Sequence, residues 1–264
     1  MKKRLDILIF ERGLAESREK AKALIMSGVV YVDNEKQDKA GAEFDETVDI
    51  QLSDSLKYVS RGGYKLEKTI EKYDLDLSGC ICADIGASTG GFTDCMLQNN
   101  ASKVYAVDVG YGQLAWSLRN DPRVICLERT NARYLNETFI QDKLDFFSMD
   151  VSFISVRLIL PALFPLLNDH AKGVILIKPQ FEAGKGKVGK NGVVRDPLIH
   201  KEVLKDISAY LIDNNYAILG LDYSPIKGPK GNIEYLAFVE KNGETRYFDI
   251  DSLVSDSHVD LNHE

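Results

Sequence analysis

Two charged residues stand where apolar, strand-like runs of the sequence end. Asp150 closes the run 146–149, and Lys178 closes the run 174–177 just before a proline. A lysine at the end of a buried strand is costly unless it is paired, and its pKa shifts readily, so Lys178 is a candidate acid or base. A purely structural ion pair between Lys178 and Asp150 is the alternative interpretation.

Glu234 and Lys65 are expected near the same place. Glu234 begins the last apolar run, which must be antiparallel to its neighbour because the connection 224–233 is too short for a helical crossover. An antiparallel strand begins at the edge where parallel strands end, so Glu234 reaches the crevice at that edge. Lys65 follows Arg61-Gly62-Gly63-Tyr64 and opens a helix; taken alone, it could be an ordinary surface lysine.

A glycine-rich turn follows the first strand-like run of this part of the chain. The segment 84–92 comes directly after the run and opens a helix, where α/β folds bind nucleotide-like ligands. Its spacing is not G-x-G-x-x-G, which disfavours a dinucleotide, and D-x-G-x-x-x-G-x-F resembles the first motif of S-adenosylmethionine-dependent methyltransferases. In such a motif the acidic residue faces the methionine moiety. The candidate cofactor residues of the turn are Asp84, Gly86, Ala87, Ser88, Gly90, Gly91 and Phe92.

Two further strand ends are expected to complete the cofactor site. Asp108 closes the second run, where a carboxylate can accept hydrogen bonds from both ribose hydroxyls of an adenosine. Asn131 and Ala132 follow the third run and are placed to flank the adenine.

These residues need a sheet that brings strand ends together. From residue 80 onward, apolar runs rich in strand-forming residues alternate with helix-like segments, which predicts a parallel, doubly wound α/β sheet. We expect a Rossmann-like class I methyltransferase fold with a seven-stranded, mostly parallel sheet and an antiparallel last strand. The seven runs are 80–84, 103–108, 124–128, 144–150, 173–178, 216–223 and 234–240.

Residues 1–58 predict a separate, small α+β domain. Two short helices end at Gly13 and Gly28, and strand-like runs follow. Seven basic and four acidic residues between Met1 and Lys22 leave three excess positive charges. They form either a phosphate-facing patch or only the solvated faces of two helices. A second basic segment, the lysine-rich loop at 184–190, either closes over RNA or is a flexible solvated loop. The candidate RNA-contacting residues are Arg4, Arg18, Lys20, Lys22, Lys185 and Lys187.

Composition excludes several classes of protein. With 33 basic and 40 acidic residues among 264, the net charge is −7, so the chain is not a uniformly basic nucleic-acid coat. The apolar stretch 158–167 is shorter than the roughly 18 to 20 residues of a membrane span, and charged residues interrupt any signal-peptide core near the start. We expect a cytoplasmic protein with buried, reduced cysteines and no metal. The acidic segment 249–264 is expected to be loosely held.

The four charged residues and several short segments resemble a known family. The order Lys65, Asp150, Lys178, Glu234 is similar to the Lys-Asp-Lys-Glu tetrad of FtsJ-like RNA 2′-O-ribose methyltransferases. The segments that resemble the TlyA family in particular, often labelled hemolysin-like, are 60–63, 86–92, 129–131, 152–155 and 178–182. The linker 56–59, Leu-Lys-Tyr-Val, departs from the Arg-x-Trp-Val of the mycobacterial member.

This resemblance implies one domain for RNA binding and one for methyl transfer. It implies an RNA-binding domain of the ribosomal-protein-S-four type at 1–58 and an S-adenosylmethionine-dependent methyltransferase domain at 59–248. The implied substrate is ribosomal RNA or a ribosomal subunit, methylated on ribose. We expect a monomer. The sequence does not indicate which nucleotide or which subunit is modified.

The chemistry of the tetrad can also be argued from the reaction. A ribose 2′-hydroxyl is a poor nucleophile at neutral pH, so a site must remove or stabilise its proton while the oxygen attacks the sulfonium methyl in line. We expect Lys178 to be the principal base or alkoxide stabiliser, with a pKa lowered by Lys65, and Asp150 and Glu234 to orient the lysines and the hydroxyl. The alternatives are a catalytically silent rRNA-binding or ribosome-assembly factor, a membrane-active hemolysin, and a Rossmann oxidoreductase.

Overall fold

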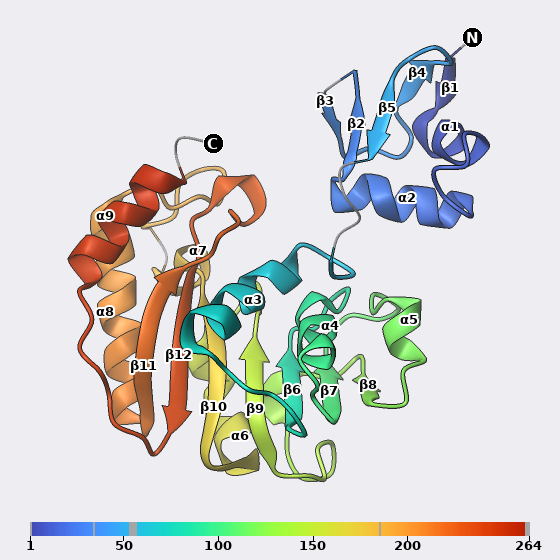
Figure 1. Ribbon diagram of the computed structural model, residues 1–264. Coiled ribbons are helices and arrows are strands. Elements are labelled where there is room, and N and C mark those ends of the chain that lie inside the picture. Colours follow the sequence, from blue (N-terminus) through green and yellow to red (C-terminus); the bar gives the residue numbers. More distant parts are fainter. Residues whose placement is uncertain (1, 34, 53–56, 185, 262–264) are drawn as a thin grey trace. The chain divides into compact units, whose positions relative to one another are not determined.

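The protein consists of two compact units. The computed structural model describes residues 2–33, 35–52, 57–184 and 186–261. The units are Met1–Arg61 and Gly62–Glu264, whose elements are labelled in Figure 1. Sequence analysis placed the boundary between residues 58 and 59. Lys185 and Leu56, which carry earlier predictions, lie outside the described residues.

The first unit packs two helices against short strands. Ser17 caps the second helix by accepting a hydrogen bond from the backbone N of Lys20 at 3.1 Å, and Gly28 ends it with a φ of 74°. The helices bury an apolar stripe that includes Leu5, Ile9 and Ile25, as helical spacing predicts. The elements are β1 (Lys2–Arg4), α1 (Leu5–Glu11), α2 (Arg18–Ser27), β2 (Val30–Val32), β3 (Glu35–Gln37), β4 (Glu43–Asp45) and β5 (Ile50–Leu52).

The second unit is built on a seven-stranded sheet, which confirms the predicted fold. The strand order is β11-β12-β10-β9-β6-β7-β8, and β12 runs antiparallel to both of its neighbours. The pairs from β10 across to β8 are all parallel. The strands are β6 (Ile81–Ile85), β7 (Lys103–Val107), β8 (Val124–Leu127), β9 (Leu144–Met149), β10 (Leu167–Ile177), β11 (Tyr216–Tyr223) and β12 (Tyr235–Lys241).

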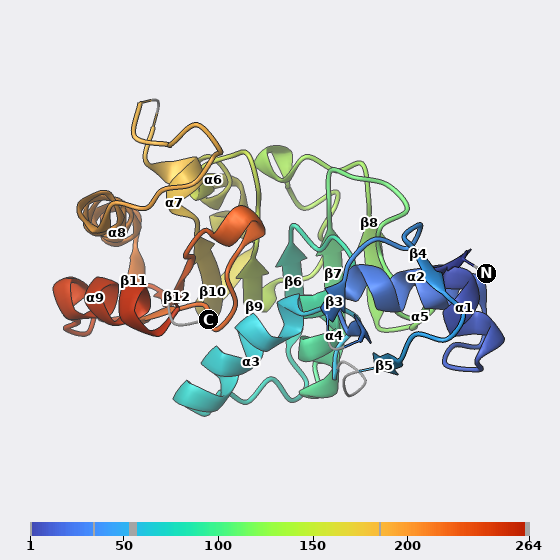
Figure 2. The same cartoon turned by 90° about the horizontal axis from the view of Figure 1, so that it is seen from above.

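Helices cover both faces of this sheet. Figure 2 shows α3 and α4 on one side of the sheet and α6 and α8 on the other. The helix α3 buries Leu66 and Ile70 at helical spacing, and α8 buries Leu204, Ile207 and Leu211. The helices are α3 (Gly62–Tyr73), α4 (Gly91–Gln98), α5 (Trp116–Arg119), α6 (Leu160–Leu163), α7 (Pro179–Glu182), α8 (Pro197–Asp213) and α9 (Ile250–Asp260). The 3₁₀ turns are η1 (Ala132–Tyr134), η2 (Val156–Leu158), η3 (Phe164–Leu166) and η4 (Pro229–Gly231). Among the described residues, no helix is long and apolar enough to cross a membrane.

The acidic C-terminal segment corrects one expectation. Residues 250–260 form α9, whose first backbone N–H groups are capped by the Asp249 carboxylate. Val254, Ser257 and Leu261 are buried, and α9 packs against α8 and β11. Their i, i+3, i+7 spacing is a narrow helical stripe that the surrounding acidic residues obscure in the sequence. The expectation of a loosely held segment is therefore wrong for residues 250–261.

A buried polar cluster joins α8, α9 and β12. His200 is fully buried; its Nε2 lies 3.0 Å from the Val194 carbonyl oxygen and its Nδ1 lies 2.7 Å from the Tyr235 hydroxyl. Because Nε2 faces a carbonyl, it carries the proton, and Nδ1 accepts from Tyr235. The ring of His258 lies against that of His200. Burial is the main reason why the pKa values of both histidines are lowered.

These histidines predict a loss of stability on mild acidification. A group with a lowered pKa in the folded state stabilises the fold above its unfolded pKa, about 6.5 for histidine, and this contribution is lost as the pH falls below that value. Urea unfolding at pH 7.5 and pH 5.5 should show a drop in the free energy of unfolding that is smaller in His200→Gln and His258→Gln. An identical drop in wild type and both variants would contradict this assignment.

Candidate active site

The structure brings together the four residues of the predicted tetrad. Lys65 lies in the first turn of α3, Asp150 and Lys178 directly follow β9 and β10, and Glu234 directly precedes β12. The Lys65 Nζ is 2.8 Å from Glu234 Oε2 and 3.4 Å from Asp150 Oδ2. The Lys178 Nζ is 2.5 Å from Asp150 Oδ1. The four charges therefore form one chain of ion pairs in the order Glu234, Lys65, Asp150, Lys178.

Most of this chain is shielded from water. The Glu234 side chain is 0% exposed, Lys65 11% and Lys178 8%. Burial alone would lower the pKa of Lys65, but the Asp150 and Glu234 carboxylates outweigh it and the pKa is raised. For Asp150, burial favours the neutral acid, and the two ammonium groups outweigh it and lower the pKa. Lys65 is thus cationic and Asp150 anionic throughout the neutral range.

Two further polar side chains complete the site. The Lys178 Nζ donates to Ser152 Oγ at 3.1 Å, and Gln180 Nε2 donates to Glu234 Oε1 at 3.3 Å. The Gln180 amide oxygen is buried without a hydrogen-bond partner within the described part of the chain. Both residues belong to segments that resemble the TlyA family, and no role was predicted for either of them. The available signal was position, because Ser152 and Gln180 each follow a tetrad residue by two.

The predicted cofactor turn lies against the tetrad. Gly86 has a φ of +86°, and a Cβ at this position would occupy the space of the Asp150 carbonyl. The backbone N–H groups of Gly86 and Ala87 both donate to the Val107 carbonyl, at 2.9 and 3.0 Å. The end of β6 is therefore fixed between the ends of β7 and β9, and only glycine permits this approach at position 86.

Asp108 ties the turn to the neighbouring strand. Its Oδ2 accepts from the Ser88 backbone N at 2.8 Å, and its Oδ1 accepts from the Gly110 backbone N at 2.7 Å. A carboxylate has about four acceptor positions, so Asp108 can also bind ribose hydroxyls. Asn131 is exposed, and its Oδ1 accepts from the Arg133 backbone N at 3.1 Å, which starts the 3₁₀ turn that contains Ala132. This donor and acceptor set fits the adenosine part of S-adenosylmethionine.

The Asp84 side chain is turned into the protein interior, and its contact with the cofactor stays a prediction. Its side chain is buried; Oδ2 accepts from the backbone N and the hydroxyl of Thr93 at 2.9 and 2.7 Å, and Oδ1 accepts from Ser148 Oγ at 2.9 Å. Burial raises the pKa of Asp84 to about 6. Alternation along β6 turns this carboxylate toward α4, where Gly91 and Phe92 are also buried, so these residues shape the turn from inside.

The Asp84 geometry predicts that its hydrogen bonds matter and its charge does not. Asp84→Asn keeps an acceptor for Thr93 and can donate to Ser148, so isothermal titration calorimetry should give a dissociation constant for S-adenosylmethionine within about threefold of wild type. Asp84→Ala leaves the buried Thr93 and Ser148 groups without a partner, which costs about 1–3 kcal/mol per group, and should weaken binding far more. Equal losses in both variants would instead indicate that the carboxylate charge contacts the cofactor.

The predicted RNA-contacting residues lie in two different settings. Arg4 and Arg18 each have a half-exposed side chain and both donate to the buried Asp6 carboxylate, at 3.0 Å. Lys20 forms an exposed ion pair with Glu16 on the helix surface, and Lys22 is half-buried. In the second unit, Lys187 pairs with Glu202 of α8. The two arginines therefore share one buried carboxylate, whereas Lys20 and Lys187 each pair with an exposed glutamate.

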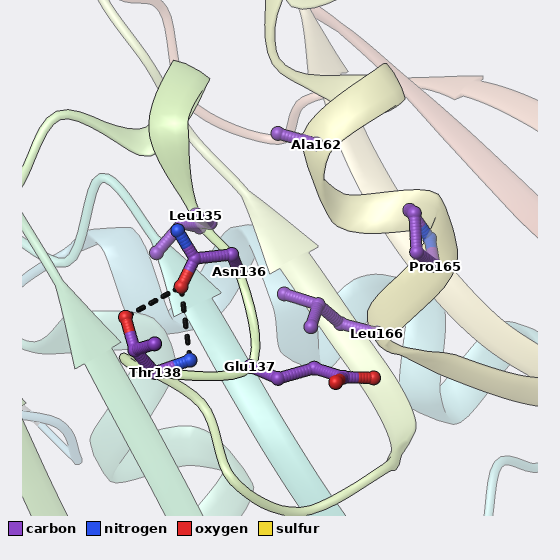
Figure 3. Close-up of a pocket in the computed structure, with 7 residues that line it drawn as sticks. All are labelled: Leu135, Asn136, Glu137, Thr138, Ala162, Pro165 and Leu166. Atoms are coloured by element: carbon purple, nitrogen blue, oxygen red, sulfur yellow. Dashed lines mark hydrogen bonds between the residues drawn. The ribbon is translucent and has the colours of Figure 1, made fainter.

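A surface cavity lies apart from the tetrad and the cofactor turn. It has a volume of about 420 Å³ and is lined by residues 135–138 with Ala162, Pro165 and Leu166. Figure 3 shows the Asn136 side chain turned toward Thr138. The Asn136 Oδ1 accepts hydrogen bonds from the Thr138 backbone N and from the Thr138 hydroxyl, at 2.9 and 2.5 Å. The Asn136 amide oxygen, one of the polar groups that line the cavity, thus forms its hydrogen bonds within its own turn.

The fold and the site together define an S-adenosylmethionine-dependent methyltransferase. Residues 58–241 match the FtsJ-like methyltransferase family, and residues 3–50 match the S4 domain. The chain belongs to the FtsJ-like methyltransferase family and, within it, to the TlyA proteins, which carry an S4 domain in front. The resemblance inferred from the tetrad and the short segments is confirmed.

Three relatives illustrate this membership. The Bacillus subtilis protein named "Putative rRNA methyltransferase YqxC" is 51% identical over 92% of this chain and 87% of its own length. The Mycobacterium tuberculosis 16S/23S rRNA (cytidine-2′-O)-methyltransferase TlyA is 44% identical over 89% of either chain. A solved structure described as a "putative hemolysin" from Streptococcus thermophilus superposes with a TM-score of 0.80 at 46% identity, covering 99% of this chain and 98% of the other.

Proposed function

We propose that this protein transfers a methyl group from S-adenosylmethionine to the ribose 2′-hydroxyl of cytidine in ribosomal RNA. The observation that carries the proposal is the contact between the cofactor turn and the tetrad, which Gly86 makes possible beside Asp150. The activity named for the Mycobacterium tuberculosis relative supports ribosomal RNA and cytidine as the substrate. The complete tetrad favours an enzyme over a silent ribosome factor.

Lys178 is the residue that we assign to the hydroxyl proton. Its Nζ contacts Asp150 and Ser152, and we place the ribose hydroxyl at the remaining position of this tetrahedral nitrogen. The neutral amine accepts the hydroxyl proton as the oxygen attacks the methyl group, and the ammonium formed in this way stabilises the negative charge developing on the oxygen. S-adenosylmethionine supplies the electrophilic methyl group when bound.

Lys65 and the carboxylates act around Lys178. Because its pKa is raised, Lys65 is a fixed positive charge that holds Asp150 and Glu234 in place and stabilises negative charge nearby. Asp150 contacts both lysines directly, so the Nζ of each lysine faces a carboxylate. We retain Asp150 and Glu234 as the orienting residues of the tetrad.

Removing the Lys178 amine should abolish transfer without abolishing cofactor binding. We expect Lys178→Ala to lower turnover about 10²- to 10⁴-fold, the usual contribution of a general base or acid, and to leave S-adenosylmethionine affinity within a few fold. The assay is transfer of radiolabel to purified small and large ribosomal subunits that lack ribose methylation, with label recovered in alkali-resistant dinucleotides. Lys143→Ala, which removes an exposed lysine paired with Glu137, is the matched control. Wild-type turnover in Lys178→Ala would exclude this lysine from the mechanism, and absence of label with wild type would refute the proposed activity.

We further propose that both units contact the RNA. In the first unit, Asp6 orients Arg4 and Arg18 toward phosphates, with Lys20 and Lys22 adding charge. In the second unit, we expect Lys185 and Lys187 of the lysine-rich loop to contact the RNA as well. Phosphate contacts of this kind supply affinity that depends on salt but carry little sequence information.

The residues just after the lysine-rich loop are anchored beside the catalytic edge. The Asn232 amide oxygen accepts from the Val194 backbone N at 3.1 Å, and its amide nitrogen donates to the Gly192 carbonyl at 3.0 Å. Asn232 precedes Glu234 by two residues, so this clip joins residues 192–194, just after the lysine-rich loop, to the segment that leads into β12. The clip supports an RNA-contacting role for the loop over that of a freely moving segment.

The arginine pair predicts a change in salt dependence. Each phosphate contact contributes about 0.7 to 0.9 to the slope of log affinity against log salt, so Arg4→Ala/Arg18→Ala should reduce the slope for ribosomal RNA by about 1 to 2. Filter binding at several KCl concentrations measures this slope. The control is Arg123→Ala, which removes an arginine paired with Asp121 in the second unit. An unchanged slope in the double variant would show that the pair only neutralises Asp6.

A further inference from the structure

The helix α3 presents three lysines along one face, and the proposed mechanism uses only the first. Lys65, Lys68 and Lys72 are spaced i, i+3 and i+7. Lys65 belongs to the tetrad. The Lys68 Nζ donates to Asp222 Oδ1 at 2.9 Å and to the Tyr223 carbonyl oxygen at 2.7 Å, and the Lys72 Nζ donates to Asp222 Oδ2 at 2.8 Å. One carboxylate therefore binds two successive turns of the helix that supplies Lys65.

The burial and charge of Asp222 suit it to bind two lysines of α3 at once. Its side chain is 10% exposed, and its two oxygens each bind a different lysine. Burial would raise the pKa of Asp222, but the hydrogen bonds from Lys72 and Lys68 outweigh this and the pKa is lowered, so it remains an anion. The Lys68 Nζ also lies 4.0 Å from the centre of the Tyr223 ring, which adds a cation–π contact on the same strand.

The position of Asp222 in the sheet links it to the tetrad. Asp222 lies in β11 opposite Leu236 of β12, and Leu236 follows Glu234 by two residues. The strand β11, which contains Asp222, and the strand β12, which Glu234 precedes, are thus hydrogen-bonded neighbours. Both Asp222 and Glu234 bind lysines of α3. The helix is held at two points on one rigid strand pair, by Glu234 near its start and by Asp222 further along.

We infer that Asp222 is a positioning residue for methyl transfer, which fixes α3 along its axis and so places the Lys65 ammonium between Asp150 and Glu234. Lys65 has a long side chain and must meet two carboxylates at once, at 2.8 and 3.4 Å. Without Asp222, Lys68 and Lys72 are like charges one turn apart that repel each other. A displacement of about 1 Å in a catalytic group can cost about a hundredfold in rate.

The first test is kinetic and rests on the proposed function. Asp222→Ala should lower kcat about ten- to a hundredfold with the KM for S-adenosylmethionine within twofold, and Asp222→Glu should restore most of the rate because it returns the carboxylate. In a Lys65→Ala background, followed by single-turnover transfer, Asp222→Ala should change the rate less than twofold. Asp142→Ala is the matched control, because Asp142 also accepts from two side chains, Lys103 and Tyr105, away from the tetrad.

The second test does not need activity. A cationic, ion-paired Lys65 reacts slowly with an amine-acylating reagent, so mass spectrometry should find its labelling severalfold faster in Asp222→Ala than in wild type and unchanged in Asp142→Ala. A wild-type kcat for Asp222→Ala, an equal loss of rate with and without Lys65, or unchanged Lys65 labelling would each overturn the inference. A wild-type protein that labels Lys65 as expected but transfers no methyl group would instead refute the proposed function.

Discussion

The site depends on one interaction, the compensation of two buried lysines by the carboxylate between them. Asp150 contacts Lys65 through one oxygen and Lys178 through the other. Ammonium groups with so little exposure would be strongly disfavoured without such a partner. Because the two lysines come from α3 and from the end of β10, this carboxylate also joins two separate parts of the fold. The charges of the tetrad therefore hold α3 against the end of β10, in addition to their proposed role in catalysis.

The antiparallel strand β12 makes this arrangement possible. Inserted between β10 and β11, it begins at the edge where the parallel strands end, so Glu234 reaches the tetrad from a strand of opposite direction. A parallel strand in the same place would present its end there and leave its start at the far edge. The loop before β12 passes close to the Glu234 side chain at Gly228. A Cβ at position 228 would clash with the Glu234 carboxylate.

The sequence predicted features that follow from strand ends and strand order. Alternation and connection length indicated the seven-stranded sheet, and each tetrad residue stands next to an element boundary that the pattern marks. The pattern could not show which way a side chain turns near the end of a strand. The Asp84 carboxylate, expected to face the methionine moiety, accepts hydrogen bonds from Thr93 and Ser148. The role of α9 was missed because three buried positions are spread among acidic residues. Ser152, Gln180 and Asp222 depend on contacts between segments far apart in the chain, and spacing does not contain that information.

The close approach of Gly86 to Asp150 has a consequence for the way in which the cofactor turn and the tetrad are connected. Its missing side chain lets the cofactor turn rest on the backbone of Asp150, and the Asp150 backbone N in turn donates to the Ile85 carbonyl at 2.9 Å. The turn and the backbone of Asp150 are thus in direct contact, with no side chain between them. We therefore expect a shift of the turn to reach the Asp150 backbone directly, since the two segments touch without a side chain between them.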